Sequence, residues 1–155
     1  MSLVLSLGSN LGNKLDNLNK AISSLNEIFL SPISISRVYQ SEPFGPVPQD
    51  DFYNLCIEYK LPNYSPEECM QYCLNTELIM GRTRDIKWGP RVIDIDILYY
   101  GLNEINSEIV TLPHPHIMDR SFVVLPLGDL SYFDTLQNHF EYPTIFSTTT
   151  KVIKA

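Results

Sequence analysis

The sequence predicts an α+β sandwich in which helices pack on one face of an antiparallel sheet. Short apolar runs and longer helical patterns follow one another in the order β-α-β-β-α-β. Each helical pattern connects two strand-like runs, which is the order of a ferredoxin-like fold. The 155 residues fit one domain over positions 1–155, although residues 131–155 carry little pattern of their own.

The first part of the chain supplies a strand, a helix and a second strand. Residues 3–7 are almost entirely apolar and predict a buried strand, which a turn over 8–13 follows. Apolar residues from Leu15 to Leu25 recur at helical spacing, so we expect a helix over about 14–28. Pro32 interrupts the chain, and a second strand runs from Ile33 to about Ser41.

The middle of the chain continues with a stiff loop, a third strand and a second helix. Three prolines and a glycine within residues 42–48 exclude regular structure there. A strand is predicted from Phe52 to Leu61. Ser65 is suited to cap the helix that follows, because Pro66 fits its first position and Gly81 its end.

The last elements are a fourth strand and a short helix. We expect the strand over Val92–Tyr100, with a turn at 101–103 that leads to a short partner strand at about 105–110. Residues 113–120 are irregular, and 121–130 suit a short helix. Beyond Leu130 the pattern fades.

Composition excludes several classes of protein. The formal net charge is −7 and the sequence pI is near 4.8, which argues against non-specific binding to nucleic acid. No apolar run approaches the ~20 residues of a membrane span, and no signal peptide is recognisable. Cys56, Cys69 and Cys73 match no disulfide or zinc spacing, so we expect buried free thiols in a reducing, cytoplasmic compartment.

A cationic stretch is the most informative part of the chain. Four of the eleven Lys and Arg residues fall within positions 82–91, namely Arg82, Arg84, Lys87 and Arg91. Arginine forks match phosphate oxygens, and the nearby Asp85 cannot balance four cations. The stretch therefore predicts a site for a polyphosphate, on a long loop that closes over its ligand.

Two carboxylates follow the cationic stretch in the predicted fourth strand. Asp94 and Asp96 share one face of that strand, while Ile93, Ile95 and Ile97 occupy the other. Same-face neighbours lie about 7 Å apart, which suits one metal ion or a bridged pair. Magnesium is the expected ion, because it accepts one or two carboxylates and takes its other ligands from phosphate and water.

Other segments complete the expected site. Gly8–Lys14 follows a strand but lacks the spacing and the Gly-Lys-Ser/Thr ending of a P-loop, so we expect a plain turn there. The segments around Phe44 and from Phe52 to Asn54 offer aromatic rings and an amide, which suit a flat heterocycle or, equally, a core. His114 is a candidate donor to phosphate or ribose.

Five motifs in chain order resemble the 6-hydroxymethyl-7,8-dihydropterin pyrophosphokinases of folate biosynthesis. The resemblance covers about residues 3–130. The motifs are Gly8-Ser-Asn-Leu-Gly12, Tyr39-x-Ser41-x-Pro43-x-Gly45, Gln49-x-x-Phe52-x-Asn54, Arg82-x-Arg84 with Trp88-Gly-Pro-Arg91-x-x-Asp94-x-Asp96, and Pro113-His114 with Arg120-x-Phe122.

The resemblance implies a ferredoxin-like fold, an activity and a set of roles. The activity is transfer of the pyrophosphoryl group of ATP to the pterin hydroxymethyl oxygen, with release of AMP and the use of two Mg²⁺ ions. By the same resemblance, Asp94 and Asp96 hold the metal and act in catalysis with Arg82 and Arg91. The implied ATP-binding residues are Glu77, Arg84, Lys87, Trp88, Ile97, Thr111, His114 and Arg120. The implied pterin-binding residues are Ser41, Pro43, Phe44, Phe52, Asn54 and Phe122.

Two alternatives stay open at the level of the sequence. One is an inactive module that binds pterin or nucleotide, and the other is a different magnesium-dependent kinase on the same scaffold. The intact set Arg82, Arg91, Asp94 and Asp96 favours an enzyme. We expect ATP and hydroxymethyldihydropterin as its partners, a monomer, and neither nucleic acid nor membrane.

Overall fold

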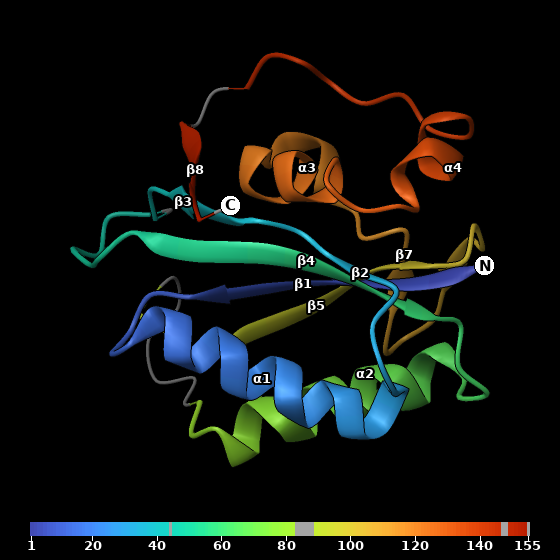
Figure 1. The fold of residues 1–155 in the computed structure, drawn as a ribbon, viewed down its shortest axis with the longest axis horizontal. Helices are drawn as coiled ribbons and strands as arrows, with labels where there is room; N and C mark the ends of the chain where they lie inside the picture. Colours follow the sequence, from blue (N-terminus) through green and yellow to red (C-terminus); the bar gives the residue numbers. More distant parts are fainter. Residues whose placement is uncertain (44, 83–88, 147–148, 155) are drawn as a thin grey trace.

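A computed structural model describes residues 1–43, 45–82, 89–146 and 149–154. Its centre is a six-stranded antiparallel sheet in the order β5-β1-β4-β3-β8, with β2 also paired to β4 (Figure 1). The strands are β1 (Ser2–Ser9), β2 (Ser34–Ile35), β3 (Val38–Ser41), β4 (Phe52–Lys60), β5 (Asp94–Tyr100) and β8 (Thr150–Lys154). The predicted α+β fold with helices on an antiparallel sheet is thereby confirmed.

Two helices cover one face of this sheet. They are α1 (Lys14–Phe29) and α2 (Pro66–Ile79), which lie side by side below the strands in Figure 1. The Asn13 side chain caps α1 by accepting from the Asp16 amide, and Ser65 and Glu68 form a reciprocal capping box on α2. Gly81 follows α2 with a φ of 89°, which suits glycine at a helix end.

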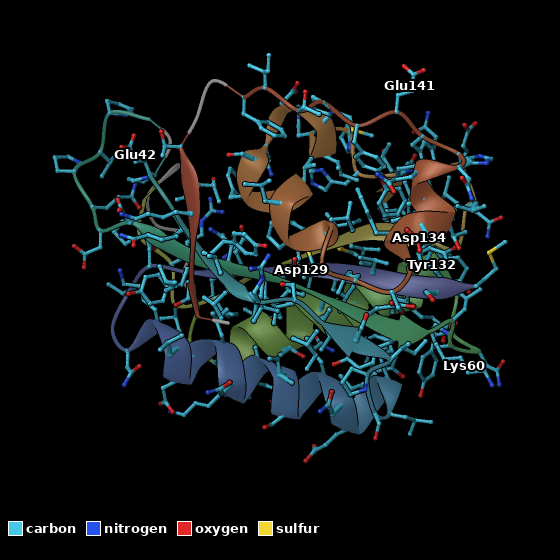
Figure 2. The ribbon with its side chains drawn as sticks, turned by 45° about the horizontal axis from the view of Figure 1, so that its top comes forward. Glu42, Lys60, Asp129, Tyr132, Asp134 and Glu141 are labelled. Carbon is cyan, nitrogen blue, oxygen red and sulfur yellow. The ribbon has the colours of Figure 1, made fainter. Side chains whose placement is uncertain are left out.

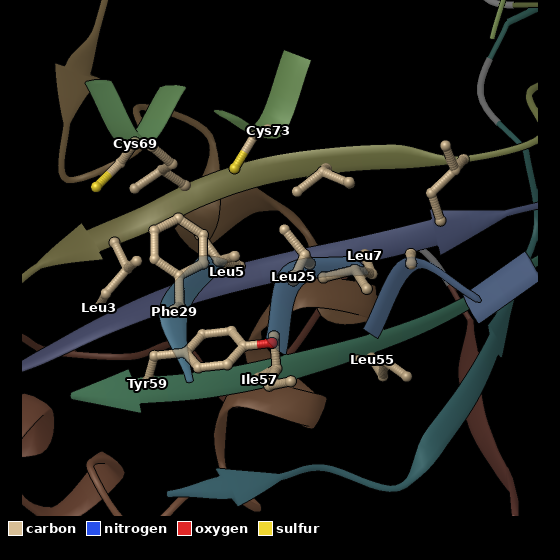
Figure 3. Packing of buried hydrophobic residues seen from close by; sticks show 14 of the residues in the cluster. Leu3, Leu5, Leu7, Leu25, Phe29, Leu55, Ile57, Tyr59, Cys69 and Cys73 are labelled. Carbon is tan, nitrogen blue, oxygen red and sulfur yellow. The ribbon is translucent and has the colours of Figure 1, made fainter. Parts of the chain in front are cut away.

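The larger core lies between these helices and the sheet. Alternate residues of β1 and β4, such as Leu5 and Ile57, meet Leu25 and Phe29 of α1 (Figure 3). Cys69 and Cys73 of α2 are almost fully buried in the same cluster as free thiols, as predicted.

The opposite face of the sheet is covered as well, which corrects the prediction that helices pack on one face. Helix α3 (Ser121–Leu127) lies over β3 and β4, and α4 (Phe133–Gln137) follows it (Figure 1). A second core forms there around Val4, Cys56 and Leu127. Both faces of β1 are therefore buried, which explains its nearly continuous apolar sequence.

One further prediction is wrong in detail. The segment after Tyr100 does not extend the main sheet, because β6 (Ile105–Asn106) pairs with β7 (Thr111–Leu112) in a separate sheet. The chain then forms a 3₁₀ turn over Ile117–Asp119. The strand β8, which had no clear signal in the sequence, pairs with β3 at the edge of the main sheet. Among the described residues, no helix is both long and apolar enough to cross a membrane.

A buried carboxylate fastens the segment after α3 to the sheet. Glu58 of β4 is only 2% exposed and accepts hydrogen bonds from the hydroxyls of Ser2, Ser34 and Ser131, each at 2.7 Å. The amide of Tyr132 donates to it at 3.1 Å. Figure 2 shows Tyr132 below α4, on the side of the sheet. Burial opposes ionisation, but the four donors outweigh it and lower the pKa of Glu58.

We expect the Glu58→Gln substitution to destabilise the protein most at neutral pH. Because folding lowers the pKa of Glu58, its charge stabilises the folded state above the ordinary pKa, and this contribution is lost as the pH falls through the folded-state value. At pH 7 the free energy of unfolding should drop by about 1–3 kcal/mol. Urea unfolding at pH 7 and pH 4 should show the difference from the wild type shrinking at the lower pH. The exposed Glu27→Gln on α1 is the control, and an equal effect at both pH values would contradict the prediction.

Candidate active site

Two neighbouring clefts lie where β1 ends and β4 and β5 begin. Both are lined by Arg91, Asp94, Asp96 and Arg120, so these four residues stand between them. The aromatic cleft also includes Ser6, Gly8, Ser41, Glu42, Phe52, Asn54, Gly89, Phe122 and Val123. The arginine cleft also includes Met70, Leu74, Glu77, Arg82, Ile95, His114 and His116.

Strand alternation places the two carboxylates toward the clefts. Ile95 and Ile97 of β5 point into the core under α1 and α2, so Asp94 and Asp96 take the other face, as predicted. In the sheet register, Gly8 of β1 lies between Asp94 of β5 and Asn54 of β4. The three strand ends therefore present one continuous polar surface.

The aromatic cleft depends on the absence of a side chain at Gly8. A Cβ atom at this position would lie 2.9 Å from Oδ1 of Asn54, closer than such contacts occur. The Asn54 Nδ2 donates to the Ser41 hydroxyl at 2.8 Å, and both side chains are buried. This bond fixes the amide so that Oδ1 lies over Gly8, at the floor of the cleft.

Two aromatic rings line the same cleft from different elements. Phe52 begins β4, and Phe122 lies in the first turn of α3. The Arg120 guanidinium lies 5.7 Å from the centre of the Phe122 ring, within the range of a cation–π contact. Rings on the wall and a fixed amide on the floor are the features that suit a flat, polar-edged heterocycle.

The arginine cleft contains a chain of buried and half-buried ion pairs. The Nη1 atom of Arg82 lies 2.6 Å from Oε1 of Glu77 and 3.3 Å from Oδ1 of Asp94. The Arg82 side chain is 9% exposed. Arg91 donates to the other Asp94 oxygen at 3.2 Å. The Nε of Arg82 is buried and has no hydrogen-bond partner among the described residues. Two arginines thus converge on one carboxylate.

Burial raises the pKa of two carboxylates in the arginine cleft, while neighbouring donors and cations act against this shift. Burial raises the pKa of Asp96, and the neighbouring negative charge of Asp94 raises it further. Burial also raises the pKa of Glu77, although the Ile95 amide donates to it at 2.8 Å. A cation between Asp94 and Asp96 would relieve this repulsion, so the pair fits Mg²⁺ as two hard oxygen donors. No group of three or more His, Cys, Asp or Glu side chains suited to a metal occurs in the described part of the chain.

His114 is held as a neutral ring. Burial lowers its pKa to about 4, and the cation of Arg120 contributes to the same shift. Its Nδ1 accepts from the His116 amide at 3.2 Å, which leaves the proton on Nε2. The side chain therefore offers one N–H donor to the arginine cleft.

Several predicted site residues lie elsewhere. The Ile97 side chain is 1% exposed in the core, and Thr111 is exposed on β7; neither lines the two clefts. Pro43 is half-buried beside Glu42, which does line the aromatic cleft. Four predicted ligand-binding residues lie outside the described part of the chain, namely Phe44, Arg84, Lys87 and Trp88.

The sequence reasoning missed part of both linings. Ser6 follows from strand alternation, because it shares the face of Gly8 and not that of Leu5 and Leu7. Met70 precedes Glu77 by seven residues, which is two turns of helix, so its position on the cleft side of α2 was also accessible. The exposed Glu42, labelled in Figure 2, carried no such signal.

Carboxylates and arginines beside an aromatic cleft are features that suit a charged, phosphate-bearing ligand next to a flat one. The family model for 7,8-dihydro-6-hydroxymethylpterin-pyrophosphokinase matches residues 4–132. The chain therefore belongs to this family.

Individual relatives agree with the family match. The chain is 39% identical over 131 residues to a 2-amino-4-hydroxy-6-hydroxymethyldihydropteridine pyrophosphokinase of Synechocystis, covering 83% of this chain and 65% of that protein. A Bacillus subtilis protein of the same name is 33% identical, covering 81% and 75%. The bifunctional protein FolKE of Lactococcus lactis is 40% identical, covering 89% and 38%. The chain thus spans less than two thirds of the Synechocystis and Lactococcus proteins.

We expect the His114 ring to titrate near pH 4, well below the ordinary value of 6.5. Imidazole ¹⁵N shifts should identify the Nε2–H form at neutral pH, since Nδ1 accepts from the His116 amide. The Arg120→Met substitution should raise the midpoint, because it removes a cation that opposes protonation. A wild-type midpoint near 6.5 would contradict the buried, neutral state.

Proposed function

We propose that this chain transfers the pyrophosphoryl group of ATP to the hydroxymethyl oxygen of 6-hydroxymethyl-7,8-dihydropterin, giving the pterin diphosphate and AMP. The observation that carries the proposal is that Arg91, Asp94, Asp96 and Arg120 line both clefts. A flat ring in the aromatic cleft and a triphosphate in the arginine cleft would meet at these residues. The family and the names of the relatives support the same reaction.

The aromatic cleft is the proposed pterin site. Phe52 and Phe122 would enclose the ring, while Asn54, held by Ser41, reads its polar edge. Pro43 and Phe44 are proposed to contribute beside them. A hydroxymethyl group at the open end would point toward Asp94 and Asp96, where the two clefts meet.

The arginine cleft is the proposed ATP site. His114 donates from Nε2, Arg120 supplies charge, and Glu77 anchors Arg82. Arg84, Lys87, Trp88, Ile97 and Thr111 are proposed as further contacts. The side chain of Ile97 faces the core, so its contribution would come from the backbone.

The chemical step follows from this arrangement. The pterin hydroxyl oxygen forms a bond to the β-phosphorus and loses its proton to solvent. The bond from that phosphorus to the oxygen that bridges it to the α-phosphorus breaks, and AMP leaves with that oxygen. Arg82 and Arg91 stabilise the charge that moves between these atoms, and binding in two adjoining clefts holds the reactants in line. Asp94 and Asp96 would hold Mg²⁺, proposed as two ions, which neutralises phosphate oxygens and activates the hydroxyl. We propose that the chain acts as a monomer.

The decisive test is the identity of the nucleotide product. With ATP, Mg²⁺ and 6-hydroxymethyl-7,8-dihydropterin, we expect one AMP for each pterin diphosphate, measured by chromatography. EDTA or the Asp96→Asn substitution should lower the rate by about 100-fold or more, because the phosphate charge is no longer neutralised. Release of ADP would identify a simple kinase, and binding of both ligands without product would identify an inactive module.

We expect substitutions in the two clefts to separate chemistry from pterin binding. Arg82→Ala should lower kcat by about 100-fold and leave the pterin Kd nearly unchanged, because Arg82 lies in the arginine cleft alone. Gly8→Ala should weaken pterin binding by about tenfold, because its Cβ displaces Asn54. Turnover assays and calorimetry with the pterin measure both effects. Equal losses of kcat and affinity in Arg82→Ala would contradict its assigned role.

A further inference from the structure

Asn10 joins the segments that lead into the two clefts. It follows β1, is 2% exposed, and uses every hydrogen-bonding group of its side chain. Its Nδ2 donates to Oε1 of Gln49 at 2.7 Å and to the carbonyl of Asp50 at 3.0 Å. Its Oδ1 accepts from the Arg91 amide at 2.8 Å, and its own amide donates to the Arg91 carbonyl at 3.1 Å.

Each partner of Asn10 leads directly to a proposed substrate-binding residue. Gln49 and Asp50 precede β4, whose first residues include Phe52 and Asn54 in the aromatic cleft. Arg91 precedes β5, and its guanidinium bonds to Asp94 in both clefts. The Asn10 side chain itself lines neither cleft, so it acts on the site through these segments.

The first residue of α1, which follows this turn, holds the segment before β4 a second time. Nζ of Lys14 donates to the carbonyl of Asp51 at 2.9 Å and lies 4.5 Å from the centre of the Tyr53 ring. These Lys14 contacts reach only the segment before β4, whereas Asn10 bonds to both segments. The turn between β1 and α1 is therefore a clamp in which Asn10 alone among its described residues bonds to Arg91.

We infer that Asn10 is a positioning residue that sets the Arg91 guanidinium against the pterin-side segment, an inference that rests on the proposed function. The backbone of Arg91 is fixed by two hydrogen bonds to one residue, which restricts where its side chain reaches Asp94 and the transferring group. Residues that orient an active-site group in this way commonly affect activity by about 10-fold to 100-fold.

The chemistry of the amide makes two substitutions informative. Asn10→Ala removes the side-chain bonds to both segments and leaves only the backbone bond from the Asn10 amide to the Arg91 carbonyl. Asn10→Asp retains an acceptor for the Arg91 amide but places an oxygen against the Asp50 carbonyl, so it disrupts the pterin-side connection only. Asn17→Ala is the matched control, because Asn17 bonds to Ser9 and Leu11 in the same turn and to neither segment.

Hydrogen exchange of the Arg91 amide tests the connection without the reaction. We expect this amide to be protected in the wild type, in Asn10→Asp and in Asn17→Ala, and to exchange at least about tenfold faster in Asn10→Ala. Unchanged protection in Asn10→Ala would overturn the inference. Absence of AMP from the wild type would instead reject the proposed function, whatever the exchange rates show.

Steady-state kinetics test the positioning. Asn10→Ala should lower kcat by about 10-fold to 100-fold and raise the pterin KM, whereas Asn10→Asp should mainly raise the pterin KM. Adding Asn10→Ala to Arg91→Ala should cost little more kcat than Arg91→Ala alone, because both act through the same guanidinium. Full additivity, or a folded Asn10→Ala with wild-type kcat, would overturn the inference. Asn17→Ala should retain wild-type kinetics.

Discussion

The close approach of three strand ends at Gly8 is the constraint on which the site depends. Asp94 and Asn54 flank this glycine in the sheet register, and the missing Cβ leaves room for the Asn54 amide. Any larger residue would press on the floor of the aromatic cleft. Because Asp94 also belongs to the arginine cleft, this backbone position lies beside a residue that both clefts share.

Burial then gives the polar groups their properties. Helices cover both faces of the sheet, and a hydrophobic core lies on each side (Figure 1). Charged side chains of the strands can therefore reach solvent at the ends of the strands, outside the two cores. The partly buried Asp94 forms ion pairs there with Arg82 and Arg91. Burial also makes it unfavourable for Asp94 and Asp96 to be charged together unless more positive charge is added. Two carboxylates that repel each other in this way are suited to bind a cation, which would enter the site together with the ligand.

Sequence patterns predicted the fold and the centre of the site because both follow from periodicity and local chemistry. Alternation in β5 gave the shared face of Asp94 and Asp96, and the Ser65 cap gave the start of α2. They did not predict α3 on the second face or β8 at the sheet edge. Short segments such as β8 owe their conformation to a partner strand, and α3 to the apolar surface of the sheet beneath it.

Asn10 illustrates why the remainder of the site is invisible in the sequence. Its side chain bonds to residues 39, 40 and 81 positions away, and no local pattern records such separations. Asparagine is common in turns because of its backbone preference. Its presence in this turn therefore gives no sign of a contact with distant segments. Burial distinguishes a tertiary role from a local one, because a turn residue chosen for conformation has no reason to be 2% exposed with its whole amide in use. In this chain, the buried and fully bonded amide between the two proposed substrate-binding segments is therefore a feature that only the structure reveals.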